Sequence, residues 1–176
     1  MEGFIEIRPR RRFFLRLYLH IMLRVLGRAI QAAARVDENV KKEFDAMPET
    51  YTFSLGAFPA GPCMIIGKDA QGTVRYMGSD MEKQPVHLKI TLKSVRHFFS
   101  LLTFMESTPV SNARNRMMVS GDVPYACAAV RIMDIVQVYL LPGWMAKMAI
   151  KRYPRWTLKR HTVDRAKVLI RTLLGF

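Results

Sequence analysis

The chain has 176 residues, half of them apolar, which is one domain's worth of sequence and argues against a multi-domain enzyme. Its 28 Lys and Arg residues outnumber its 14 Asp and Glu residues, so the net charge is +14. An acidic partner is therefore expected, either nucleic acid or an anionic lipid surface.

The basic residues lie at the two ends of the chain. Residues 1–35 carry eight Arg against two Glu, a net charge of +6, and residues 147–176 carry nine Lys and Arg against one Asp, a net charge of +8. The stretch 36–146 holds the other 11 basic and 11 acidic residues and is neutral. We predict a basic amphipathic helical arm over residues 1–47, a central domain over 48–142 and a basic helical tail over 143–176.

The first segment is predicted to be a long helix over residues 9–45, because apolar side chains recur every three or four residues along one face. Gly27 is the expected kink or junction between two shorter helices. Arg16, His20 and Arg24 interrupt the apolar run, so we expect no export signal. No stretch of the chain reaches the roughly 18 to 20 uncharged apolar residues of a spanning helix, so we expect no membrane-spanning segment.

The period then changes to two, which is typical of strands. Residues 51–55 alternate, and residues 64–66 and 73–76 flank a turn-rich connection over 67–72, which predicts an antiparallel hairpin. Residues 86–92 form the most regular strand pattern in the chain.

Ser94 is the predicted N-cap of a helix, and the apolar stripe of that helix is Val95, Phe98, Leu102 and Met105.

The rest of the chain is predicted as a loop, a short strand and further helices. Residues 109–115 read as the loop and residues 116–120 as the strand. A helix then begins after Asp122, with Pro124 in its first turn. Two short helices over residues 144–152 and 162–174 follow the break at Pro142 and Gly143.

Two segments carry a resemblance to a known family. They are VHLKITLKSVRHFFSLL at residues 86–102, a strand followed by a capped helix, and RMMVSGD at residues 116–122, a strand closed by Gly-Asp. With the preceding hairpin they resemble the sterol carrier protein 2 (SCP2) family of lipid-binding domains over about residues 48–135. Residues 133–142 look like its bacterial branch of accessory lipid carriers in ubiquinone biosynthesis.

The resemblance implies an α+β domain for residues 48–142, with a small, mostly antiparallel sheet, helices packed on one side and an apolar tunnel that holds a lipid tail. The long arginine-rich helix and the basic tail are not part of the minimal family domain. These two segments argue against a function limited to soluble sterol transfer.

Apolar composition agrees with a deformable cavity, because the chain has 12 Met and 10 Phe residues. The alternative, a solid core made by the same side chains, stays open. The candidate lipid-binding residues are Phe53, Leu88, Ile90, Phe98, Leu102, Met105, Met117, Val119, Ala126, Val130 and Met133.

Both basic ends mix cations with aromatic side chains, as helices do when they lie among lipid headgroups. The alternative is that each helix packs on the domain and leaves a solvated face. The candidate membrane-contacting residues are Arg10, Arg11, Arg12, Phe13, Phe14, Arg16, Trp144, Lys151, Arg152, Arg155, Trp156, Lys159 and Arg160.

Catalysis has little support in the sequence, and we expect no enzyme activity, no cofactor and no metal. The glycines at 67 and 72 lack the Lys of a phosphate-binding loop, and the four His residues show no metal-ligand spacing. Cys63 and Cys127 form no CxxC pair and are expected to be small buried side chains in a reducing cytoplasm.

The sequence therefore predicts a cytoplasmic, membrane-peripheral carrier for a hydrophobic lipid of the sterol, fatty-acyl or isoprenoid-quinone type. Its partners would be that lipid, an anionic membrane surface and enzymes of lipid or quinone biosynthesis to which it presents the cargo. Nucleic-acid binding through the basic ends is the alternative, although no nucleic-acid-binding motif is recognisable.

Overall fold

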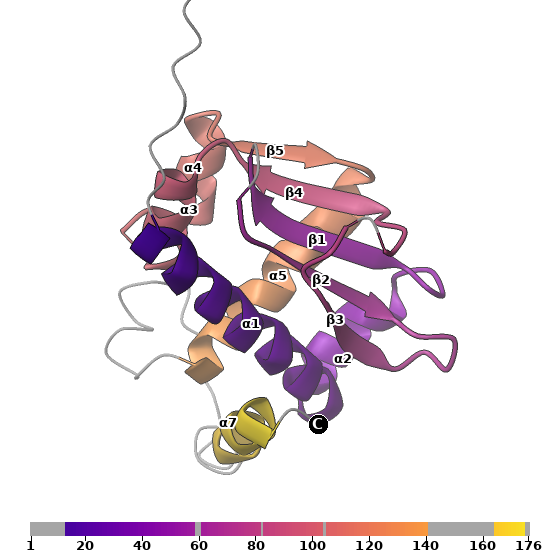
Figure 1. Cartoon of the computed structure of the whole chain (residues 1–176). Helices are drawn as coiled ribbons and strands as arrows, with labels where there is room; N and C mark the ends of the chain where they lie inside the picture. Colours follow the sequence, from indigo (N-terminus) through magenta and orange to yellow (C-terminus); the bar gives the residue numbers. More distant parts are fainter. Residues whose placement is uncertain (1–12, 59–60, 82, 104, 141–163, 175–176) are drawn as a thin grey trace, which may run out of the picture.

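The computed structural model describes residues 13–58, 61–81, 83–103, 105–140 and 164–174. The fold is α+β, with a five-stranded sheet and helices against it (Figure 1). The predicted fold class is confirmed in this general form. Residues 1–12 and 141–163, with the predicted helix over 144–152, lie outside the described residues.

The first helix is continuous through the glycine that was expected to bend it. Helix α1 runs from Phe13 to Val36, and α2 runs from Glu38 to Asp45. The junction lies at Asp37, which has an extended backbone and is the N-cap of α2. Its side chain accepts a hydrogen bond of 2.8 Å from the Asn39 amide. The prediction of a kink or junction at Gly27 is therefore wrong.

Five strands form one sheet in the order β3-β2-β1-β4-β5. They are β1 (Thr52–Ala57), β2 (Cys63–Lys68), β3 (Val74–Gly78), β4 (Leu88–Leu92) and β5 (Met117–Ser120). The hairpin of β2 and β3 is confirmed. The sheet is mixed, which corrects the antiparallel prediction, because β1 and β4 run parallel.

A crossover explains the parallel pair. After β3 the chain returns across the sheet and enters β4 on the free side of β1. Bonds at both ends hold this connection against the face away from the helices. The Cys63 thiol donates to the Ser79 carbonyl at 2.8 Å, and the Thr52 hydroxyl donates to the Pro85 carbonyl. Because β4 then starts from the same end as β1, the two strands run in the same direction.

The other helices in the described ranges are α3 (Val95–Leu102), α4 (Thr108–Ala113), α5 (Val123–Leu140) and α7 (Arg165–Leu174). Ser94 caps α3 as predicted, since its hydroxyl accepts from the His97 amide at 3.2 Å. Helix α4 occupies most of the stretch that was predicted to be a loop.

The core lies between the helices and one face of the sheet. Phe53 pairs with Ile66 on one side and Leu88 on the other, and all three side chains are fully buried on that face. Helix α1 adds the fully buried Leu19 and Ile30 to the same cluster. The described part of the predicted arm therefore shares one core with the predicted central domain.

By length and composition alone, α5 could cross a membrane, and 44 % of it is buried inside the protein. A criterion of wholly uncharged apolar residues excludes this helix, because it contains two charged side chains. The core helix of a soluble protein passes the same test of length and composition. Helix α5 carries Arg131 and Asp134 and packs against α1, α2 and β4.

Candidate functional site

The apolar interior collects most of the candidate lipid-binding residues. Sheet strands β1 and β4 and helices α3 and α5 each contribute to it, because their apolar stripes face one another. The fully or largely buried members are Phe53, Leu88, Ile90, Phe98, Leu102, Ala126 and Met133, and the half-buried Met117 and Val130 pack against them.

Two candidates lie outside this cluster. Met105 is 76 % exposed, because α3 ends at Leu102 and the helical stripe does not extend to it. Val119 is 41 % exposed. It pairs with Ile90 and shares its face of the sheet, but it lies on the edge strand.

Aromatic rings line one end of the interior. Phe44 on α2 stacks on Phe53 with ring centroids 6.3 Å apart, and Tyr51 contacts both His87 at 5.2 Å and Tyr125 at 4.8 Å. Of these residues, only Phe53 was among the candidate lipid-binding residues. Phe44 and Tyr51 follow the helical and alternating apolar patterns, so periodicity could have indicated them.

Tyr51 places a polar atom at this end of the interior. Its side chain is largely buried, and its hydroxyl makes no hydrogen bond with any of the described residues. Burial raises the pKa of the Tyr51 phenol, and the nearby Asp122 and Tyr125 raise it further. A neutral hydroxyl without a partner can donate to a carbonyl or hydroxyl oxygen of a bound molecule.

The opposite side of α1 exposes apolar side chains. Phe13 and Phe14 are 68 % and 84 % exposed, and Leu17 and Ile21 continue the strip along the helix. Tyr18 anchors this part of α1 to the domain through an edge contact with Phe99 of α3 at 5.2 Å. The candidate residues Phe13 and Phe14 therefore lie on the surface, where they can meet a partner.

Only Phe13, Phe14 and Arg16 of the candidate membrane-contacting residues are described. Arg16 is half-buried on α1. The others lie outside the described residues: Arg10, Arg11, Arg12, Trp144, Lys151, Arg152, Arg155, Trp156, Lys159 and Arg160.

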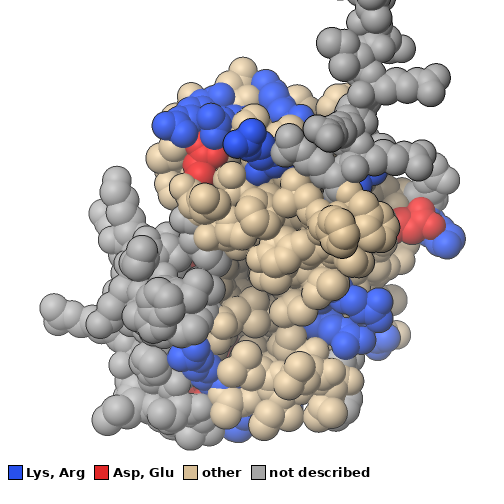
Figure 2. Space-filling view, turned by 60° about the vertical axis from the view of Figure 1, so that its left-hand side comes forward, with Lys and Arg blue, Asp and Glu red and all other residues tan. Residues whose placement is uncertain are grey.

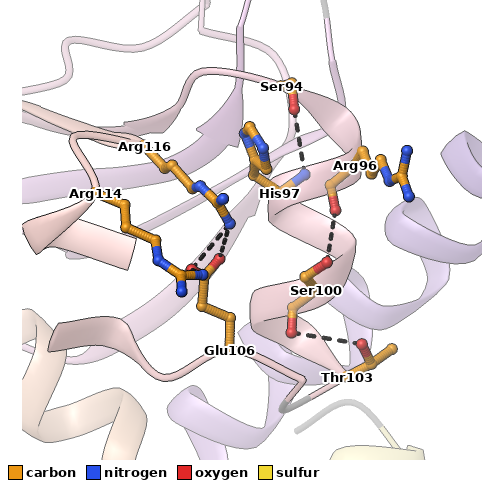
Figure 3. A network of polar contacts seen from close by, with 8 residues as sticks. All are labelled: Ser94, Arg96, His97, Ser100, Thr103, Glu106, Arg114 and Arg116. Carbon is orange, nitrogen blue, oxygen red and sulfur yellow. Dashed lines mark hydrogen bonds and ion pairs between the residues drawn. The ribbon is translucent and has the colours of Figure 1, made fainter. Parts of the chain in front are cut away.

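The central domain has a basic cluster that net charge alone did not reveal. The buried Glu106 carboxylate accepts bonds from Arg114 at 3.0 Å and Arg116 at 2.7 Å (Figure 3). Burial alone would raise the pKa of Glu106, but the bonds from Arg116 and then Arg114 hold that pKa below its usual value. Two guanidinium groups near the surface thus share one buried carboxylate.

The cysteines differ in their surroundings. Cys63 is buried as expected, and burial, followed by the charge of Asp80, raises the pKa of its thiol. Cys127 is exposed, which corrects the expectation that it is buried, because it falls on the outer face of α5. Among the described residues no three His, Cys, Asp or Glu side chains gather as metal ligands.

No family model matches the chain, and no curated protein matches it. Solved structures do resemble it. The apo sterol carrier protein 2 from Yarrowia lipolytica is 19 % identical, and the match covers 66 % of this chain and 90 % of that one at a TM-score of 0.46. The chain is similar to SCP2 domains.

Two further structures give the same likeness. The UbiJ-SCP2 ubiquinone synthesis protein is 11 % identical over 70 % of this chain and 96 % of its own, with a TM-score of 0.42. The sterol carrier protein domain 2 of Helicoverpa armigera is 14 % identical over 74 % and 94 %, with a TM-score of 0.39. These are the domains that the resemblance in the sequence predicted.

Proposed function

We propose that this protein is a membrane-peripheral carrier that holds one hydrophobic lipid between the helices and the sheet. The observation that carries the proposal is the gathering of nine of the 11 candidate lining residues in one apolar cluster, while α1 turns Phe13 and Phe14 outward. Burial of each lipid methylene contributes about 0.8 kcal/mol, so an acyl or prenyl chain needs no charged anchor.

A single polar group suits this type of cargo. The Tyr51 hydroxyl at one end of the cluster has no hydrogen-bond partner in the described part of the chain, and it can bond a sterol hydroxyl, a quinone carbonyl or an acyl carbonyl. An isoprenoid quinone presented to biosynthetic enzymes is the finer form of the proposal, and it follows from the sequence resemblance. A cytoplasmic location at the membrane surface belongs to the same proposal.

The basic ends and the exposed α1 strip would bring the carrier to the bilayer. Each Lys or Arg near an anionic surface contributes about 1 kcal/mol, and the ends have net charges of +6 and +8. Exposed Phe side chains next to these cations suit the headgroup layer. The protein would collect and deliver its lipid there.

A fluorescent fatty-acyl probe tests cargo binding in the interior. Ala126→Phe places a large side chain inside the cluster, and Cys127→Phe adds the same group at the adjacent, exposed position of α5. We expect Ala126→Phe to weaken probe binding at least about tenfold and Cys127→Phe to leave it within about twofold. Thermal unfolding confirms that each variant is folded. Absence of probe binding by the wild-type chain would reject an acyl cargo.

A further inference from the structure

A hollow of about 210 Å³ lies between α1 and the end of β3. Helix α1 contributes His20, Ile21 and Arg24, β3 contributes Tyr76, and Ser79 follows that strand. The three α1 side chains are on the exposed side of the helix, away from the buried face that forms the core. The hollow is thus a surface site, separate from the interior that the proposed cargo would occupy.

No ion pair within the described ranges neutralises the cations at this hollow. Among the described residues Arg24 and Arg28 make no ion pair with a carboxylate. Asp80, which follows Ser79, is bonded to Lys83 at 2.9 Å. Burial raises the pKa of the Tyr76 phenol, and the charges of Arg24 and Arg28 oppose that rise, so both guanidinium groups act on this ring.

The hollow opens beside the exposed apolar strip of α1. Ile21 belongs to both, and Leu17 lies one turn before it, with Phe14 and Phe13 beyond. On this side of the molecule, groups of Lys and Arg are separated by surface of neither charge (Figure 2). A cationic recess beside an apolar strip complements an anionic group that is attached to hydrocarbon.

We propose that the hollow binds a phosphate group, with Arg24 and His20 as its donors. The forked guanidinium of Arg24 matches two phosphate oxygens. The His20 imidazole and the hydroxyls of Ser79 and Tyr76 supply further N–H and O–H donors. Ile21 and Leu17 would contact the apolar chains of a lipid. The phosphate can come from a phospholipid headgroup or from a soluble phosphate ester. Only if the phosphate belongs to a phospholipid headgroup does the inference rest on the proposed membrane contact.

The first arm of the test uses glycerol 3-phosphate as a soluble probe of the full-length chain. Nuclear magnetic resonance shifts of the His20 ring and the Arg24 side chain report binding, and we expect Arg24→Gln to abolish the His20 shift. Arg35→Gln is the matched control, since Arg35 is exposed on the same helix about 16 Å further along it. The control should keep the shift.

The second arm uses galactolipid vesicles that contain phosphatidic acid or, at equal surface charge, oleate. On phosphatidic acid, Arg24→Gln should weaken binding about fivefold and Arg35→Gln less than about twofold. On vesicles that contain oleate, the two variants should bind with equal affinity. A selective loss on vesicles without a soluble response identifies a headgroup, and a response in both arms identifies a site for phosphate from either source.

Two results would overturn the proposal. One is that Arg24→Gln and Arg35→Gln behave alike in both arms. The other is that Arg24→Gln loses as much binding on oleate as on phosphatidic acid, which would show attraction to charge instead of recognition of phosphate. Probe binding in the interior of the Arg24→Gln variant is measured in parallel, so failure of the surface site is distinguished from failure of the carrier function.

Discussion

Gly27 of α1 lies directly against the ring of Tyr76 on β3. A Cβ atom at position 27 would stand 2.4 Å from Cδ2 of that ring, closer than carbon atoms can approach. The missing side chain allows the helix to pack closely on β3, and Tyr76 is held there by a bond from its amide to the Gln31 side chain at 2.9 Å. The same ring lines the surface hollow.

Gly27→Ala should lower the free energy of unfolding. Overpacking costs about 1 to 3 kcal/mol, and Ala returns about 1 kcal/mol of helix propensity, so the net loss is up to about 2 kcal/mol. Urea unfolding of the full chain measures it. Arg35→Ala, at an exposed position of the same helix, should change the value by less than about 0.5 kcal/mol. A stability gain at position 27 would show that Tyr76 moves aside freely.

Two buried tyrosines should respond oppositely to loss of the hydroxyl. Tyr139 on α5 donates to the Asp37 carboxylate at 2.6 Å and joins α5 to the α1–α2 junction, whereas the Tyr51 hydroxyl bonds to none of the residues that the structure describes. Tyr139→Phe should cost about 1.5 to 3 kcal/mol, and Tyr51→Phe should be neutral or stabilising. Equal losses in urea unfolding would contradict the assigned bonding. Reduced affinity of Tyr51→Phe for a sterol or quinone, with unchanged affinity for a plain hydrocarbon, would support its contact with cargo.

The Glu106 cluster should make stability depend on pH in acid. Because the folded-state pKa of Glu106 lies below the usual value of about 4.5, its contribution is present above that pH and is lost as pH falls through the lowered pKa. Urea midpoints of the wild type should therefore fall below about pH 4.5 more steeply than those of Glu106→Gln. Glu49→Gln, at an exposed position, is the control and should follow the wild-type profile. Parallel profiles for wild type and Glu106→Gln would remove this cluster from the acid response.

Charge reversal in the first basic segment should weaken vesicle association. Replacing Arg10, Arg11, Arg12 and Arg16 by Glu should reduce binding to anionic vesicles by more than about tenfold, since each cation contributes about 1 kcal/mol. Co-sedimentation measures the loss, and unfolding of the variant should match that of the wild type. Reversal of Lys41 and Lys42, exposed on α2, should have a smaller effect per charge. Unchanged sedimentation of the first variant would exclude this segment from membrane binding.

Features set by neighbouring residues were predictable from the sequence. The Ser94 hydroxyl caps α3 by accepting a hydrogen bond from the amide three residues later in the chain. The β2–β3 hairpin depends on Gly72, whose positive φ of 74° suits the turn. The apolar stripe of α3 and the alternation along β4 likewise identified Phe98, Leu102, Leu88 and Ile90 of the interior cluster.

Features set by distant contacts were not predictable in this way. The parallel pairing of β1 with β4 depends on the crossover held by Ser79 and Pro85, which leaves no local pattern. Gly27 is a close-packing site only because Tyr76 faces it. Exposure of Val119 follows from its place on the edge strand, and alternation within the strand contains no information about the sheet order.

Native mass spectrometry of the gently purified full-length protein, followed by organic extraction, tests the carrier function most directly. Protein from a membrane-containing lysate should carry one noncovalent hydrophobic molecule, and that molecule should be depleted in Ala126→Phe and retained in Cys127→Phe. A mass equal to that of the bare polypeptide, with no lipid in the extract, would contradict the proposal that this fold encloses a lipid.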